Sequence, residues 1–301
     1  MSERRIGAEE LRAAAERAVA RARGAGVLEP IATQVLEIAE GGLRFAVHQR
    51  PEEHQRRIAS DPAAPRTNPF LDPPAPLVVG AVSDTHLCLL NRYPVLANHL
   101  LFVTRAFAPQ EAWLDPDDWA ALAVGLAGID GLGFYNAGPA AGASQPHKHL
   151  QLVPLPLGRG PEPVPIAPWL AAAAPGHEPQ MLPGPPFGHA FVRIDPGVLA
   201  LPAAEAGRAL AALADRALAV LGVRPLPGPD GAPRQSAPYN LLVTRSWLLA
   251  VPRVRAEAHG VSVNALGFAG SFVVSGAAGL ERLRAVGPLA VLRAVAGARS
   301  A

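Results

Sequence analysis

Two histidines separated by one residue lie near the middle of the chain, in the stretch GASQPHKHLQ at 142–151. Because side chains alternate between the two faces of a strand, His147, His149 and Gln151 are expected to share one face, at intervals of about 6.6 Å. Lys148, the only lysine of the chain, would then point to the opposite face. The row of polar side chains makes this stretch the first candidate for an active site.

The residues just before this row are rich in glycine and in hydrogen-bond donors. The segment AGPAAGAS at 137–144 predicts a turn whose backbone amides converge on an anion, because glycine has no Cβ atom in the way. Ser144 and Gln145 add side-chain donors. A turn of this kind beside two histidines favours phosphate chemistry.

Two other interpretations of the histidine pair stay open. Histidines on a solvated strand face often have no function, and a His-x-His pair also occurs in metal sites. Metal sites need a further Glu, Asp or His at ligand spacing. Residues 150–160 contain none of these three residue types, so the local sequence does not support a metal site.

The composition is that of a globular protein. Of the 301 residues, 50% are hydrophobic and 17% are charged. A net charge of +2 without long runs of like charge argues against nucleic-acid binding. Cys88 is the only cysteine, which excludes an internal disulfide and a multi-cysteine zinc site. Neither a signal segment nor a membrane-spanning stretch is expected, so we predict a soluble, cytoplasmic protein.

Strands arrive in hairpin-like pairs, without regular alternation of strand and helix. This order predicts an α+β fold with a largely antiparallel sheet flanked by helices. Helices are expected at 8–23, 114–128, 202–221 and 278–297, and strands at 41–50, 86–105 (two runs), 132–138, 147–154, 239–253 and 266–275. Asp115 and Pro116 are expected to begin the second helix.

The chain is predicted to form a single unit over 1–301, with a catalytic half at 40–156 and a C-terminal half at 191–301. A proline-rich connection at 157–190 is expected to run extended over the surface, with a lid as an alternative role. The similar stretches NHLLFVTR and YNLLVTR leave open whether the two halves have related folds.

The stretch NAGPAAGASQPHKHLQLVPLP resembles the active-site segment of the diadenosine tetraphosphate phosphorylases, or ATP adenylyltransferases, of the histidine-triad superfamily. The resemblance continues in DTHLCLLNRYPVLANHLLFVTRAF, YNLLVTRSWLLAVPR and VNALGFAGSFVV, so it spans most of residues 40–275. It implies a histidine-triad-like fold. It also implies that diadenosine tetraphosphate and inorganic phosphate are converted to ATP and ADP through an adenylyl-histidine intermediate.

By this resemblance, His149 is the nucleophile, and the backbone near His147 accepts the proton of the far ring nitrogen of His149. Gln151 stands where related hydrolases carry a third histidine; it binds a phosphate oxygen but exchanges no proton at neutral pH. The implied catalytic residues are thus His149, His147 and Gln151. The implied substrate-binding residues are Asn91, Arg92, Asn136, Gly142, Ala143, Ser144, Gln145, Gln151, Arg57, Asn264 and Ser271.

The sequence departs from the family pattern at several of these positions. Arg92 stands where lysine is usual, and either Arg56 or Arg57 fills the place of another basic residue. Ser271 and Ser275 stand where methionine and lysine are expected, which leaves the contacts to the second nucleotide open.

The expected partners are a dinucleoside polyphosphate, ATP, ADP and inorganic phosphate, with no nucleic acid and no membrane. No cofactor is required, with a divalent ion such as Mg²⁺ on the polyphosphate as the alternative; monomer and homodimer both stay open.

The rival functions are a nucleotidyltransferase similar to hexose-1-phosphate uridylyltransferases, disfavoured by the missing Cys-x-x-Cys motif, and a non-catalytic nucleotide-binding regulator.

The remaining histidines are interpreted as structural. His86 and His99 are expected to be hydrogen-bonded core residues, with support of the site as a second role for His99. The other five, His48, His54, His177, His189 and His259, are expected on the surface or in loops.

Overall fold

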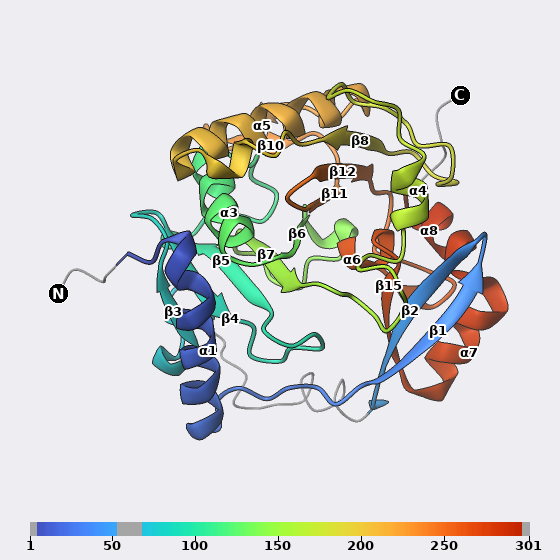
Figure 1. The fold of residues 1–301 in the computed structure, drawn as a ribbon, viewed down its shortest axis with the longest axis horizontal. Helices are drawn as coiled ribbons and strands as arrows, with labels where there is room; N and C mark the ends of the chain where they lie inside the picture. The colour runs from blue at the N-terminus through green and yellow to red at the C-terminus, as the bar shows by residue number, and fades with distance from the viewer. Residues whose placement is uncertain (1–4, 53–67, 297–301) are drawn as a thin grey trace.

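The structure is a computed structural model that describes residues 5–52 and 68–296. Its centre is an eight-stranded sheet with the order β3-β4-β5-β7-β6-β11-β12-β8, in which all neighbouring pairs are antiparallel (Figure 1). The strands are β3 (Val78–Ala81), β4 (His86–Leu90), β5 (Leu100–Thr104), β6 (Gly131–Asn136), β7 (His149–Pro154), β8 (Ala190–Arg193), β11 (Tyr239–Val243) and β12 (Trp247–Pro252). The α+β class and the largely antiparallel sheet are confirmed.

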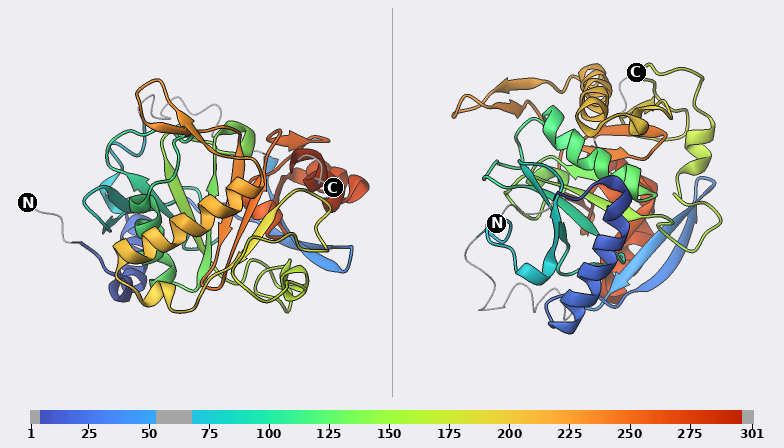
Figure 2. Two further views of the ribbon diagram at one scale, coloured as in Figure 1. Left: turned by 90° about the horizontal axis from the view of Figure 1, so that it is seen from above. Right: turned by 60° about the vertical axis from the view of Figure 1, so that its left-hand side comes forward.

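Three helices cover one face of this sheet: α1 (Ala8–Gly24), α3 (Pro116–Gly128) and α5 (Ala203–Val220). Helix α3 begins as expected, because the Asp115 side chain accepts hydrogen bonds from the first turn and forms a capping box with Asp118. Leu122 of α3 and Leu210 of α5 belong to the same apolar core as Phe102 of β5. Figure 2 shows α5 lying across the strands.

The opposite face carries two separate apolar clusters. The first, over β3–β5, contains Phe70, Ala81, Leu87, Leu89, Leu101 and Val103. The second lies over β6, β11, β12 and β8, beneath α6 (Ala265–Phe268), α7 (Gly276–Val286), α8 (Pro288–Ala296) and a three-stranded sheet. That sheet consists of β1 (Gln34–Glu40), β2 (Leu43–Arg50) and β15 (Ser271–Ser275). The first part of β7, with His149 and Gln151, therefore lies between the two clusters, whereas Val153 of the same strand belongs to the second.

Among the strands of the described residues, β15 and β2 are the one parallel pair. Strand β15 comes from the predicted C-terminal half, whereas β2 belongs to the predicted catalytic half. Two short ribbons, β9 (Pro225–Pro227) with β10 (Pro233–Gln235) and β13 (Glu257–Ala258) with β14 (Val261–Ser262), complete the strands, and the first projects from the body in Figure 2. Strands of both predicted halves thus share both of the larger sheets.

Two predicted elements near the C-terminus differ from the structure. The strand expected over 266–275 begins with helix α6 instead, because Asn264 caps that helix and Gly270, at φ 85°, reverses the chain before β15. The single helix expected near 278–297 is two helices, since Gly287 at φ 87° and Pro288 interrupt it.

The proline-rich connection is the largest difference from the expectation. It packs into the second apolar cluster through Leu157, Val164, Ile166, Trp169, Leu182 and Phe187, and contains the short helix α4 (Ala167–Ala171). The segment therefore keeps exposed stretches, such as residues 171–178, but it is anchored in the core by these side chains, which the sequence analysis did not predict. The same packing buries His48 of β2, whose Nε2 bonds the Leu157 carbonyl and which was expected at the surface or in a loop. His189 lies in a loop, as expected, but it is buried there. His54 lies outside the described residues.

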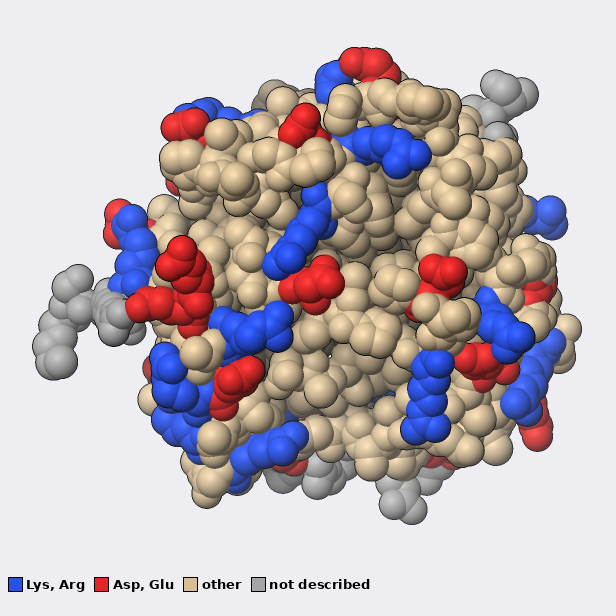
Figure 3. Space-filling model, viewed as in Figure 1, with Lys and Arg blue, Asp and Glu red and all other residues tan. Residues whose placement is uncertain are grey.

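Surface charge is mixed. Figure 3 shows basic and acidic side chains interspersed on one face, with no continuous basic area among the residues coloured there. None of the helices within 5–52 and 68–296 is long and apolar enough to cross a membrane.

Candidate active site

The predicted histidine row lies on the part of β7 between the two apolar clusters. His149 and Gln151 pair with Val103 of β5 and Phe134 of β6, in the middle of the sheet. His147 precedes the strand and forms an isolated bridge with Pro109.

The rings of His147 and His149 both contact Phe70, at centroid distances of 5.7 and 5.2 Å. The two histidines therefore lie on one face of the sheet.

His149 is held as a neutral ring with one nitrogen available. Its Nδ1–H donates to the His147 carbonyl at 2.7 Å, and Nε2 makes no hydrogen bond to a described residue. Burial disfavours the charged ring and lowers the pKa of His149 to about 4, although the bond to the His147 carbonyl acts in the opposite direction. At neutral pH the Nε2 lone pair is therefore available as a nucleophile.

His147 has both ring nitrogens occupied. Asn68 accepts a hydrogen bond from the Phe70 amide at 3.0 Å, so its own amide nitrogen faces His147 and donates to Nδ1 at 2.8 Å. The remaining proton, on Nε2, is donated to the Thr104 carbonyl at 2.8 Å. Burial is the main cause that lowers the pKa of His147. His147 therefore interacts with His149 through its backbone carbonyl. Its ring, bonded to Asn68 and Thr104, holds the backbone of His147 in place.

Gln110 is a site residue that the sequence analysis missed. It is fully buried, and its Oε1 accepts a hydrogen bond from the His149 backbone amide at 2.9 Å. Its Nε2 donates to the Asn136 carbonyl at 2.8 Å and to the His149 carbonyl at 3.3 Å. Gln110 thus bridges β6 and β7 beyond their last backbone pair, where the glycine-rich turn leaves the sheet. No local pattern in its loop could have indicated this.

The glycine-rich turn approaches the C-terminal half closely. A Cβ atom on Gly142 would lie 2.7 Å from the Val263 carbonyl oxygen, and φ is 89°, so only glycine fits there without strain. Beyond it, the backbone amides of Ser144 and Gln145 have no hydrogen-bond acceptor among the described residues. These free donors, ahead of His149, can bind phosphate oxygens.

Gln151 and Asn91 are connected through His99. Gln151 Oε1 accepts from His99 Nε2 at 3.0 Å, and Asn91 Nδ2 donates to His99 Nδ1 at 3.0 Å. The structure therefore brings Asn91 to the site through the ring of His99.

The other predicted binding residues are placed differently. Asn136 is buried; its Oδ1 accepts from the Ala265 amide and from Asn240, so it supports the fold of the site. Arg92 forms an ion pair with Glu29 at 3.0 Å. Asn264 caps α6 beside Gly142.

Ser271 is buried on β15, and its hydroxyl has no hydrogen-bond partner among the described residues, so no side-chain bond joins it to the histidine row. Ala143 lies in the turn itself, and Arg57 falls outside the described residues.

A buried arginine, also missed in the sequence, ties the turn to the C-terminal half. Arg253 donates from Nη1 to the Ala141 carbonyl and Asn240 Oδ1, and from Nη2 to the Val263 carbonyl at 2.9 Å. Burial lowers the pKa of Arg253 to about 10, so it stays charged at neutral pH. The sequence did contain an indication of the role of Asn240, because the dipeptide Tyr239-Asn240 repeats the Tyr-Asn dipeptide of β6. In the sheet, Asn240 and Asn136 are direct pairing partners.

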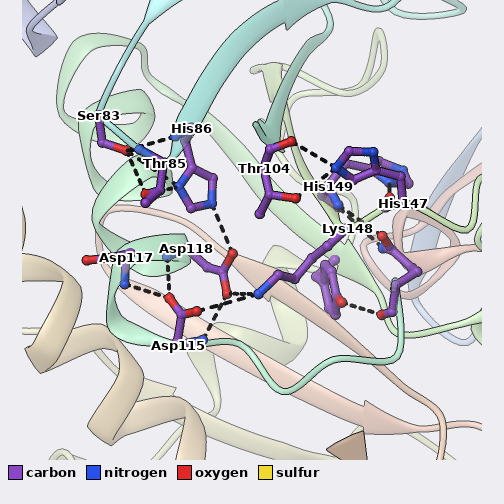
Figure 4. Close-up of polar contacts among 12 residues, drawn as sticks. Ser83, Thr85, His86, Thr104, Asp115, Asp117, Asp118, His147, Lys148 and His149 are labelled. Carbon is purple, nitrogen blue, oxygen red and sulfur yellow. Dashed lines mark hydrogen bonds and ion pairs between the residues drawn. The ribbon is translucent and has the colours of Figure 1, made fainter. Parts of the chain in front are cut away.

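Lys148 points to the helical face, as expected. Its Nζ donates to Asp118 Oδ2 at 2.6 Å, and His86 Nε2 bonds the other oxygen of Asp118 at 3.0 Å (Figure 4). Asp118 is fully buried, and its pKa is lowered because hydrogen bonds and charge from His86 and Lys148 outweigh the opposing effect of burial. His86 is thus the hydrogen-bonded core residue expected.

Comparisons with known proteins match this chain and its fold. A family model described as the Ap4A phosphorylase N-terminal domain matches residues 1–172, and one described as the ATP adenylyltransferase C-terminal domain matches residues 183–298. The diadenosine 5',5'''-P1,P4-tetraphosphate phosphorylase 2 of Saccharomyces cerevisiae is 28% identical over 243 residues, which cover 72% of this chain and 71% of the relative.

Protein APA1 of the same yeast is 37% identical over 84 residues, 26% of each chain. The crystal structure of yeast Ap4A phosphorylase Apa2 in complex with Ap4A superposes with a TM-score of 0.78 at 22% identity, covering 98% of this chain and 100% of the other. This likeness shows the shared fold. Because the first family model alone spans more than half of the residues, the chain belongs to the Ap4A phosphorylase family.

Proposed function

We propose that the chain is an adenylyltransferase that cleaves diadenosine tetraphosphate with inorganic phosphate, giving ATP and ADP. The observation that supports this most directly is the state of His149, a neutral ring whose Nδ1–H is held by the His147 carbonyl at 2.7 Å and whose Nε2 is free. The yeast relative of this chain carries the name of such a phosphorylase.

The reaction proceeds in two displacements. His149 Nε2 attacks an α-phosphorus, forming an N–P bond while the P–O bond to the remaining triphosphate breaks and ATP leaves. An oxygen of inorganic phosphate then attacks the same phosphorus, so ADP forms and His149 is regenerated. The amides of Ser144 and Gln145 and the side chain of Gln151 bind the phosphate oxygens on which charge develops.

No resident cofactor is part of the proposal. Within 5–52 and 68–296, no group of three or more His, Cys, Asp or Glu side chains could hold a metal ion. A divalent ion bound to the polyphosphate would arrive with the substrate.

The test is to incubate the protein with diadenosine tetraphosphate, with and without phosphate, and to separate the nucleotides by anion-exchange chromatography. ATP plus ADP should form only when phosphate is present. His149→Asn keeps a donor for the His147 carbonyl but has no nucleophilic nitrogen, so it should lose at least about 10³-fold in rate. His259→Asn, the same change at an exposed residue with φ 53°, is the matched control and should keep full rate.

Other outcomes would assign other functions. ATP plus AMP without phosphate would identify a hydrolase, and tight binding without turnover would identify a nucleotide-binding regulator. Full activity in His149→Asn would rule out the adenylyl-histidine route.

A further inference from the structure

A continuous row of hydrogen bonds leads from the β4–β5 loop to Gln151. The Tyr93 backbone amide donates to Asn91 Oδ1 at 3.0 Å, Asn91 Nδ2 donates to His99 Nδ1 at 3.0 Å, and His99 Nε2 bonds Gln151 Oε1 at 3.0 Å. Of these residues only Gln151 belongs to β7, and the other three lie in the loop between β4 and β5.

The direction of every bond in this row follows from its first member. A backbone N–H can only donate, so the Asn91 oxygen must face Tyr93 and its NH₂ group must face His99. His99 Nδ1 therefore accepts, which places the ring proton on Nε2. Because Nε2–H donates, Gln151 must offer its oxygen to His99.

The consequence for Gln151 is a fixed orientation of its amide. Its oxygen is occupied by His99, and its NH₂ group makes no hydrogen bond to a described residue. On the same face of β7 stands His149, one alternation away. The free end of Gln151 is therefore a pair of N–H donors beside the nucleophile.

The surroundings of His99 keep this row neutral and directional. Its ring packs against Phe134 at 5.7 Å, and its ring nitrogens bond two uncharged amides. Burial, with a smaller effect of His149, lowers the pKa of His99 to about 4. A proton added to Nδ1 would face the Asn91 NH₂ group, so the neutral ring is the form that fits.

We propose that Asn91 and His99 are positioning residues that form a one-way hydrogen-bond relay, which presents the NH₂ group of Gln151 to the phosphate being transferred. The proposal rests on the proposed function, because the relay matters only if an anionic group lies there. Without the relay, the Gln151 amide could turn over and direct its oxygen at the phosphate oxygens, which it would repel.

Three substitutions of His99 separate polarity from packing. In His99→Gln the side chain still has an acceptor for Asn91 and a donor for Gln151. In His99→Glu it offers only acceptors when ionised, so Gln151 should turn its NH₂ group away from the substrate. In His99→Leu it offers neither. We expect His99→Gln to keep kcat/KM within a few-fold, and both His99→Glu and His99→Leu to lose about 10²-fold.

A purely structural role of His99 would give a different order. Activity would then follow the thermal stability of the variants, so Tm is measured for each. A His99→Gln protein that is as stable as the wild type and as inactive as His99→Leu would overturn the relay.

The tautomer of His99 gives a second measurement that needs no activity. Long-range ¹H–¹⁵N NMR spectra of the wild type should show His99 with its proton on Nε2 at neutral pH, the signal being identified by its loss in His99→Gln. A proton on Nδ1 would overturn the proposal. If the wild type failed to cleave diadenosine tetraphosphate, the proposed function would fall while this spectrum still decided the direction of the relay.

Discussion

Burial sets the protonation state of the histidines at and near the site. It lowers the pKa of His149 and His99 to about 4, and also lowers the pKa of His147 and His48. His149 uses its neutral form as a nucleophile, and His99 and His147 each use theirs as an acceptor at Nδ1 and a donor at Nε2. The chemistry of the site therefore depends on rings that bind protons less readily than exposed histidines do.

This predicts a loss of stability in mild acid. Between pH 6.5 and about 4 the unfolded chain binds protons at His149 and His99 that the folded chain does not, so the free energy of unfolding should decrease as pH falls through this window. Each such histidine contributes a slope of about 1.4 kcal/mol per pH unit. Urea unfolding curves recorded at a series of pH values from 7 to 4.5 measure this slope.

The variants His149→Asn and His99→Gln should each flatten that slope, whereas His259→Asn should not. An unfolding free energy that stays constant from pH 7 to 4.5 would contradict the neutral state of the buried rings.

At the scale of elements, β7 serves two purposes through its alternating side chains. One face carries His149 and Gln151, and on the other face Lys148, the residue just before β7, bonds Asp118 near the start of helix α3. Asp118 also bonds His86 of β4. The ion pair thus connects the strand of the nucleophile to a helix and to a second strand, from behind the site (Figure 4).

Removing one partner of this pair should be costly. Lys148→Met leaves Asp118 buried without its cation, and we expect the free energy of unfolding to fall by about 3–5 kcal/mol. The double variant Lys148→Met with Asp118→Asn removes both charges and should recover part of that loss. Denaturant unfolding of the two single variants and the double variant measures the coupling. A double variant less stable than Lys148→Met would show that the charge was not the cause.

At the scale of the whole molecule, Arg253 joins the two regions that the family models distinguish. Its guanidinium bonds the Ala141 carbonyl of the glycine-rich turn, the Val263 carbonyl before α6 and the Val295 carbonyl of α8. No carboxylate bonds it within the described residues, so the hydrogen-bond acceptors of its charged guanidinium are backbone carbonyls and the Asn240 side chain.

A lysine cannot replace this fork of donors. Arg253→Lys should lower the free energy of unfolding by about 2–4 kcal/mol, because buried carbonyls lose their partners. Arg245→Lys is the matched control: Arg245 also bonds two carbonyls, of Leu126 and Ala127, but at the surface, and its loss should stay below about 1 kcal/mol. Equal losses of unfolding free energy in the two variants would mean that burial does not increase the contribution of the Arg253 hydrogen bonds to stability.

Local patterns in the sequence predicted much of this molecule. Asp115 and Pro116 indicated the start of α3, and alternation correctly separated Lys148 from the histidines. The elements that failed depend on contacts distant in sequence. Nothing in the proline-rich segment indicates that it packs under the three-stranded sheet, and Gln110 and Arg253 act on backbone groups that only the folded chain brings near. For the same reason, the second role considered for His99 could be recognised only from its neighbours.

The parallel pairing of β2 with β15 has a consequence for synthesis of the chain. Arg50 and Ser275, which are hydrogen-bonded, are 225 residues apart. The hairpin of β1 and β2 is made before β15, so one of its edges stays unpaired until the residues that lie between these strands in the sequence have been made. Unpaired edges are templates for association with other chains, and contacts between distant residues form slowly. A chain cut short in the proline-rich connection would keep that edge open permanently and should aggregate.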